Sequence, residues 1–141
     1  MKLSISRTDV WAATVDDRPG AVAEKLEALS AAGVNLAFII ARRAPEQRGS
    51  GVLFVTPVKG VRQVRAAEGA GFQRTSSLHS LRVEGEDKPG LGASMTKALA
   101  AGRINLRGLS AAAMGNRSVT YLALDSDTDA ARAASILKKI K

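Results

Sequence analysis

The sequence has 141 residues, of which 45% are hydrophobic and 4% aromatic, and it contains no cysteine. This composition suffices for one domain or two small ones with an aliphatic core, and it excludes disulfides, zinc–thiolate sites and thiol nucleophiles. The net charge is +8, from 21 basic and 13 acidic residues. Because the basic residues are scattered along the chain, we favour a solvated basic surface over a nucleic-acid site.

The first half of the sequence predicts the element order β-α-β-β-α-β. Short β-branched and apolar runs predict strands, and apolar residues at spacings of three and four predict amphipathic helices. The predicted strands cover residues 10–15, 34–41 and 52–58, the predicted helices cover 21–32 and 60–70, and residues 72–85 are extended again.

The turn "DRPG" at residues 17–20 separates the first predicted strand from the first predicted helix. Pro19 suits the first position of a helix, because its φ is already set and no N–H is lost. Asp17 lies just before it, where a carboxylate can accept hydrogen bonds from free helix N–H groups. At the other end, Gly33 is the expected C-terminal stop of this helix.

The second half of the sequence repeats the first half at an offset of 70 residues. The strand over 79–85 is followed by "DKPG" at 87–90, and the next helix carries an apolar stripe. Strands follow over 104–113 and 119–125, and residues 125–128 cap a last helix over 129–140. The pairs that share the offset include Asp17/Asp87, Pro19/Pro89, Gly20/Gly90, Leu29/Leu99, Asn35/Asn105 and Leu36/Leu106. We therefore interpret the chain as two copies of one unit.

The second copy lacks its last strand, because the position equivalent to Phe72 would be residue 142. An open sheet edge is a liability for a folded protein. Residues 2–6 ("KLSIS") lie one repeat, 70 residues, before residues 72–76, so we expect them to supply the missing strand. The predicted domains are residues 1–78 and residues 79–141, with residues 2–6 belonging to the second sheet.

The two copies resemble the ACT domain. The resemblance rests on D-x-P-G at the first strand-to-helix turn and on G-[VI]-N-[IL] at the next helix-to-strand turn, with 16 residues from Pro to Asn in both copies. It implies an α+β fold of two ferredoxin-like βαββαβ units, each an antiparallel four-stranded sheet with helices on one face. It also implies a non-enzymatic regulatory module that binds an amino acid or a similar small ligand at the interface between such domains.

The resemblance also implies which residues bind the ligand. The first turn of a helix offers free N–H groups to a carboxylate, and an Asn side chain offers both a donor and an acceptor. The candidate ligand-binding residues are Asp17, Arg18, Pro19, Gly20, Val34, Asn35, Leu36, Asp87, Lys88, Gly90, Leu91, Asn105 and Leu106. The alternatives are that D-x-P-G is only a helix cap and that the two Asn residues only cap their turns.

The second copy departs from the pattern at the end of its first helix. It has Arg103 at the position equivalent to Gly33, and Arg adopts a positive φ at a cost that Gly does not have. We expect either that Gly102 ends the helix one residue early or that the turn differs. If only one corner binds ligand, the sequence favours the one around Asp17 and Asn35.

The remaining expectations concern partners and competing functions. We expect a small-molecule ligand, a homodimer formed through sheet or helix pairing, and a regulated enzyme as partner, in the cytoplasm and without a cofactor, metal or membrane. We expect His79 to be structural and Trp11 to lie in the core or an interface. A nucleic-acid-binding ferredoxin-like protein is the alternative, but RNA-binding proteins with such sheets use exposed aromatic residues, and this sequence has five aromatics in all. An enzyme is disfavoured, because we identify no acid–base set or nucleophile with a base.

Overall fold

The computed structural model describes residues 2–75 and 79–140 of the chain. The chain divides into two compact units, one of residues 9–75 and the other of residues 1–8 together with 76–141. The predicted domain boundary between residues 78 and 79 falls at a segment, 76–78, that lies outside the described residues. Each unit is described by itself.

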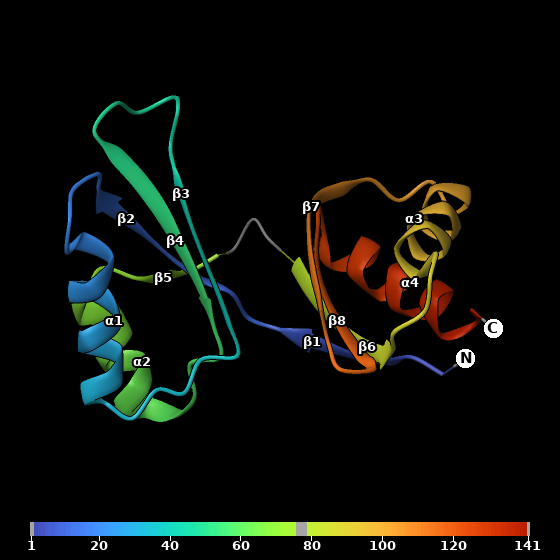
Figure 1. Ribbon diagram of the computed structural model, residues 1–141, viewed down its shortest axis with the longest axis horizontal. Coiled ribbons are helices and arrows are strands. Elements are labelled where there is room, and N and C mark those ends of the chain that lie inside the picture. The colour runs from blue at the N-terminus through green and yellow to red at the C-terminus, as the bar shows by residue number, and fades with distance from the viewer. Residues whose placement is uncertain (1, 76–78, 141) are drawn as a thin grey trace. The chain divides into compact units, whose positions relative to one another are not determined.

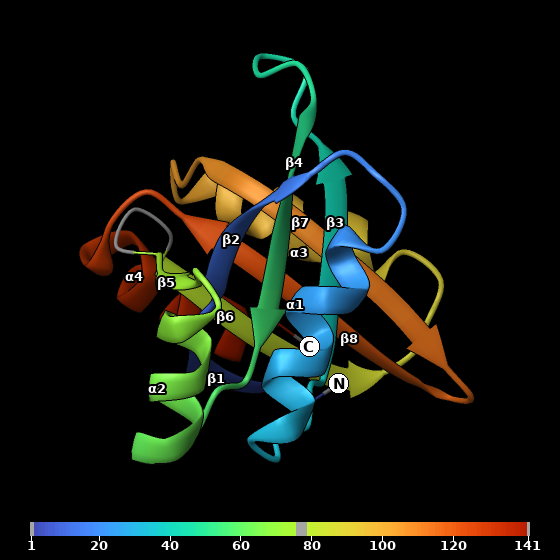
Figure 2. The same cartoon turned by 90° about the vertical axis from the view of Figure 1, so that its left-hand side faces the viewer.

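The unit of residues 9–75 contains one antiparallel sheet of four strands in the order β3-β4-β2-β5. Its two helices lie on the same face of that sheet (Figure 1, Figure 2). In chain order its elements are β2 (Trp11–Asp16), α1 (Ala21–Ala31), β3 (Phe38–Arg43), β4 (Ser50–Thr56), α2 (Gly60–Gly69) and β5 (Gln73–Arg74).

The second unit has the same architecture, with the sheet order β1-β6-β8-β7. Here α4 contacts β1, β6 and β8 and also packs against α3. Its elements are β1 (Ser4–Thr8), β6 (His79–Glu86), α3 (Leu91–Ala101), β7 (Leu106–Met114), β8 (Arg117–Leu124) and α4 (Asp127–Lys138). The predicted fold class, α+β with two ferredoxin-like units, is therefore the observed one.

The strand that the second copy lacks at its C-terminal end is supplied by β1. It pairs antiparallel with β6, with Ile5 opposite Val83 and Arg7 opposite Leu81. In the other unit β5 pairs with β2 in the same position of the sheet. This is the pairing that we expected for residues 2–6, and in the sequence residues 9–75 are inserted between β1 and β6.

Each unit has its own core of mainly aliphatic side chains. Helix α1 contributes Leu29 to one core, while α3 contributes Leu91, Met95 and Leu99 to the other, as their apolar stripes predict. Leu3, just before β1, is buried in the core of α3 and α4. No helix among the described residues is long and apolar enough to cross a membrane.

The first helix of each copy ends with the same hydrogen bonds. In α1, Val34 N–H donates to Leu29 O at 3.1 Å and Gly33 N–H donates to Ser30 O at 2.9 Å. In α3, Ile104 and Arg103 donate to Leu99 and Ala100 in the same pattern. This is the Schellman motif, whose penultimate residue has a positive φ. The predicted stop at Gly33 is confirmed at φ 81°, and Arg103 adopts φ 59°.

Gly102 has a role other than the one that the sequence suggested. The helix does not end there in a left-handed conformation, because the φ of Gly102 is −84°. A Cβ at this position would lie 2.5 Å from the Cδ1 of Ile136 on α4. Gly102 therefore leaves room for the end of the Ile136 side chain, and the neighbouring Arg103 takes the conformation that Gly33 takes in the first copy.

The predicted strand boundaries needed correction in both copies. The sequence placed strands at 34–41 and 104–113, whereas β3 begins at Phe38 and β7 at Leu106. Val34 and Ile104, the first residues of the predicted strands, donate their N–H groups to the Schellman motif of the preceding helix. In the first copy, pairing with β4 begins only at Ala37, whose N–H donates to Thr56 O at 2.9 Å. Hydrophobicity alone does not separate the approach to a strand from the strand itself.

The pairing of β1 with β6 predicts how the stability of the chain changes when this strand is removed. Deleting residues 2–7 removes one sheet edge and the buried Leu3 side chain, so the unit containing α3 and α4 should unfold or associate. Residues 9–75 should keep their fold, and Trp11, the only tryptophan of the sequence, reports on them by fluorescence.

A milder variant separates loss of the strand from loss of the fold. Leu3→Ala should lower the free energy of unfolding of its unit by about 2–3 kcal/mol, whereas Ser4→Ala, at an exposed position of β1, should change it by less than about 0.5 kcal/mol. Urea unfolding followed by circular dichroism checks both values. An unchanged unfolding curve after the deletion would contradict the structural role of β1.

The two helix ends provide a second, matched prediction. Arg103→Gly removes the cost of a positive φ and should raise the free energy of unfolding by up to about 1 kcal/mol. Gly33→Ala, at the equivalent position, should lower it by about 1 kcal/mol. Thermal unfolding of the two variants beside the parent chain tests this, and a loss of stability in Arg103→Gly would show that its side chain, not its backbone, matters there.

Candidate functional site

The two D-x-P-G motifs form the same type of turn. Ala21 N–H donates to Arg18 O at 3.3 Å, and Leu91 N–H donates to Lys88 O at 3.2 Å, so each turn closes across Pro and Gly. Gly20 has φ 86° and ψ −13°, and Gly90 has φ 82° and ψ 4°. Pro followed by a left-handed Gly is the signature of a type II turn. The Gly of each motif is therefore required by the backbone, in addition to leaving room for a ligand.

Two expectations about this turn were wrong. Pro19 does not begin the helix, because α1 starts at Ala21 and Pro19 occupies the first central position of the turn. The carboxylate of Asp17 does not cap α1, whose N-cap residue is Gly20 without a side-chain hydrogen bond. The helix N-terminus thus keeps free N–H groups that a side-chain cap would have occupied.

The corner around Asp17 is closed by two ion pairs. The Nε of Arg43 lies 3.0 Å from Oδ2 of Asp17. The guanidinium of Arg18 forms two hydrogen bonds with the carboxylate of Glu24, at 3.2 and 2.9 Å, and this pairing lowers the pKa of Glu24 and raises that of Arg18. The carboxylate and the guanidinium of this motif are therefore both engaged by side chains of their own unit.

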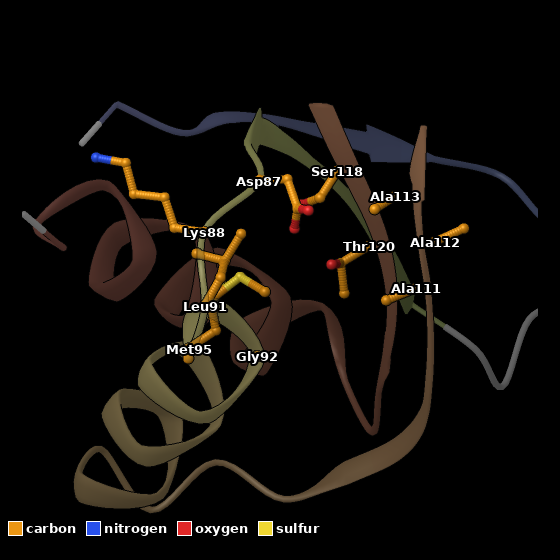
Figure 3. A pocket seen from close by; sticks show the side chains of 11 residues that line it. Asp87, Lys88, Leu91, Gly92, Met95, Ala111, Ala112, Ala113, Ser118 and Thr120 are labelled. Carbon is orange, nitrogen blue, oxygen red and sulfur yellow. The ribbon is translucent and has the colours of Figure 1, made fainter. Parts of the chain in front are cut away.

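The corner around Asp87 is open, and a pocket of about 270 Å³ lies there (Figure 3). Its walls are the D-x-P-G turn, the first turn of α3 and the facing parts of β7 and β8. The lining residues are Asp87, Lys88, Gly90, Leu91, Gly92, Met95, Ala111, Ala112, Ala113, Ser118 and Thr120. The sequence favoured the first corner, whereas this pocket lies at the second.

The difference between the corners follows from two positions on the edge strands. Arg42 and Arg43 of β3 correspond to Ala112 and Ala113 of β7 at the repeat offset of 70. Ala113 has no charge and no length to reach Asp87, so the pairing that engages Asp17 has no counterpart. Among residues 2–75 and 79–140, no cation pairs with the carboxylate of Asp87.

The central strand of the sheet differs between the copies as well. Thr120 lies opposite Val83, as Leu53 lies opposite Ala13, so Thr120 and Leu53 occupy equivalent positions. By the same register Ser118 is equivalent to Gly51. Ser118 and Thr120 were not predicted from the sequence. The repeat offset of 70 does not align them with Gly51 and Leu53, but an alignment of strand 52–58 with strand 119–125 could have indicated Thr120, which places a hydroxyl where the first copy has Leu.

The Asn positions lie at the opposite end of the helix from the D-x-P-G turn of the same copy. Asn35 and Asn105 are exposed, and neither has a side-chain hydrogen bond within the described part of the chain, so the turn-capping alternative is not observed. Within one copy the structure therefore does not bring Asp and Asn together.

The hydrophobic members of the candidate set serve the cores. Val34 and Leu36 pack against the core of the 9–75 unit, and Leu106 packs against the other. Leu91 is buried and also lines the pocket.

The side chain of Lys88 extends away from the pocket in Figure 3, and its Nζ lies 3.9 Å from Oε2 of Glu86. Of the predicted residues, the second motif thus contributes Asp87, Lys88, Gly90 and Leu91 to the pocket lining.

The described residues offer no group of three His, Asp or Glu side chains that would suit a metal ion. His79 is half-buried, with Nδ1 at 4.0 Å from Oδ1 of Asp127, which is also paired with Arg7. The pairing with Arg7 lowers the pKa of Asp127. Trp11 is buried in the core, with the guanidinium of Arg74 5.0 Å from its ring centre.

No protein-family model matches the sequence, and no curated protein matches it. Solved structures match nearly the whole chain. Protein BT0572 from Bacteroides thetaiotaomicron matches with a TM-score of 0.77 at 15% identity, over 96% of this chain and 89% of the other. The ligand-free regulatory subunit of aspartate kinase from Thermus thermophilus matches with a TM-score of 0.64 at 17% identity, over 99% and 98%.

Aspartate kinase from Synechocystis also matches, with a TM-score of 0.63 at 21% identity, over 99% of this chain and 27% of that chain. At these identities the likeness concerns the fold. The chain has the tandem ferredoxin-like, ACT-type fold that its sequence motifs indicate.

Proposed function

We propose that the protein is a non-enzymatic regulatory module that binds an amino acid or a similar small ligand at the D-x-P-G corner of its second copy. The observation that carries the proposal is the pocket beside Asp87, which opens onto the uncapped first turn of α3. A volume of about 270 Å³ lies at the small end of the range for ligand sites. The pocket therefore suits a small molecule rather than a nucleotide or a peptide.

The chemistry of the corner matches an amino acid. The N–H groups of a first helical turn bind carboxylates, and the adjacent Asp87 offers an acceptor for an ammonium group. Leu91 and Met95 supply an apolar wall. A ligand with both charges and a short side chain would satisfy these groups together.

The regulatory part of the proposal rests on how the motifs are distributed. Asp and Asn of one copy lie at opposite ends of a helix, so a site that used both motifs would need two copies, from one chain or from two chains. A ligand held in this way stabilises the paired state by its differential affinity for it. We propose a homodimer and a regulated enzyme as the partners that receive this signal. Two of the structures that share the fold are named as an aspartate kinase regulatory subunit and as the kinase itself.

The alternative is nucleic-acid binding through the basic surface. None of the five aromatic side chains is fully exposed, as a stacking platform for a base would be: Trp11 and Phe72 are buried, and Phe38, Phe54 and Tyr121 are half-buried. Several of the basic side chains are also paired with acids, as Arg18, Arg82 and Arg117 are. These observations favour the small-ligand proposal.

A thermal-shift measurement on the full chain with each of the twenty amino acids, at low and at high salt, tests the proposal. One or a few of them should stabilise the chain, by about 2.7 kcal/mol at a hundred times the dissociation constant, which corresponds to a rise in Tm of several degrees. The shift should persist at high salt. No shift with any amino acid, together with salt-sensitive binding of a generic oligonucleotide, would overturn it.

A further inference from the structure

The pocket beside Asp87 has a polar wall that its fold does not require. Thr120 and Ser118 of the central strand β8 are 2% and 8% exposed. Neither hydroxyl has a hydrogen-bond partner within the parts of the chain that the structure describes, and neither oxygen is shut off from the pocket, because the one fully buried side-chain atom without a partner there is Nε1 of Trp11. Figure 3 shows the side chain of Thr120 directed into the space between β8 and α3. Hydroxyls that line a pocket without a partner of their own protein can hydrogen-bond a ligand that enters it.

The third polar group of this wall is the carboxylate of Asp87. It points into the same space in Figure 3 and has no cationic partner among residues 2–75 and 79–140. An ionised carboxylate only accepts hydrogen bonds, and each hydroxyl can accept as well. One negative charge and two hydroxyl acceptors match an ammonium group, which has three N–H donors and a positive charge.

Donors lie on the other side of the pocket, at the start of α3. The N-cap residue Gly90 provides no side-chain hydrogen bond, and helix geometry leaves the N–H groups of Gly92 and Ala93 free. A Cβ built on Gly92 would meet no atom within 4 Å, so the approach to these N–H groups is open. A carboxylate is the group that such a helix start binds.

The first copy also has an uncapped helix start, but it lacks the other features. Leu53 and Gly51 stand in place of Thr120 and Ser118, and Arg43 holds Asp17 in an ion pair at 3.0 Å. The start of α1 carries Val22 where α3 carries Gly92. The corner thus offers no hydroxyls, no unpaired carboxylate and a bulkier approach to the helix.

We infer that each chain binds one ligand, in the pocket of the second copy, with the ammonium group of the ligand on Asp87, Ser118 and Thr120 and its carboxylate on the first turn of α3. This inference rests on the proposed function and adds to it the stoichiometry, the orientation of the ligand and two residues that recognise it. The duplicated unit has accordingly divided into a binding copy and a closed copy.

The test uses the full chain labelled with ¹⁵N and titrated with each of the twenty L-amino acids and with its N-acetyl derivative. Those amino acids that bind should shift the amide signals of Gly92 and Thr120 and leave those of Val22 and Leu53 in place. Their N-acetyl derivatives, which lack the ammonium group, should not bind.

Matched variants separate the two copies. Asp87→Asn should weaken binding about ten-fold or more, whereas Asp17→Asn should leave the dissociation constant unchanged. Thr120→Val keeps the shape of the side chain and removes the hydroxyl, and it should weaken binding by about ten-fold, with the fold of its unit checked by the unchanged amide signals of β1 and α4.

The outcomes are distinguishable. Binding of no amino acid at all would overturn the proposed function. Binding that Asp17→Asn abolishes and Asp87→Asn leaves intact would overturn the inference alone, as would two equivalent sites per chain. Equal affinity for the N-acetyl derivatives would overturn the proposed orientation of the ligand. Full affinity in Thr120→Val would show that the Thr120 hydroxyl does not contact the ligand.

Discussion

The fold of the unit that contains α3 and α4 depends on the pairing of β1 with β6. Residues 79–140 form three strands of this sheet, and the fourth, β1, precedes residues 9–75 in the sequence. Without β1 the core around α3 and α4 would have an open edge beside β6, the strand that leads into the turn at Asp87. The position of that turn, and with it the pocket, therefore depends on a segment at the start of the chain.

The two D-x-P-G turns share the residues that set their backbone conformation, but they differ in the side chains that surround them. Both copies keep Pro and a left-handed Gly, because a type II turn favours Pro at its first central position and needs a positive φ at its second. The side chains around the turn are free to change. In the first copy Arg43 engages Asp17, and in the second Ala113 stands at the equivalent position and leaves Asp87 available. A motif match alone would have counted the two corners as equal.

The fold could be predicted almost completely from the sequence, because periodicity, turn residues and the repeat all reported on local backbone structure. The pairing of β1 with β6 could be expected from the repeat, because residues 2–6 lie 70 positions before residues 72–76. From the sequence, the candidate site could be predicted only as a D-x-P-G corner, without the side chains of other strands that line it. The backbone role of Gly90, the engagement of Asp17 and the exposure of Thr120 to a pocket depend on contacts across the sheet. Sequence spacing does not encode which side chain of a distant strand reaches a turn.

The central claim is that the second copy, and not the first, holds the ligand. Hydrogen–deuterium exchange of the full chain, with and without each of the twenty amino acids at millimolar concentration, tests it most directly. A bound amino acid should slow exchange at residues 87–95 and 118–120 and leave residues 17–25 and 51–53 unchanged. Equal slowing at both sets, or slowing at residues 17–25 alone, would contradict the claim.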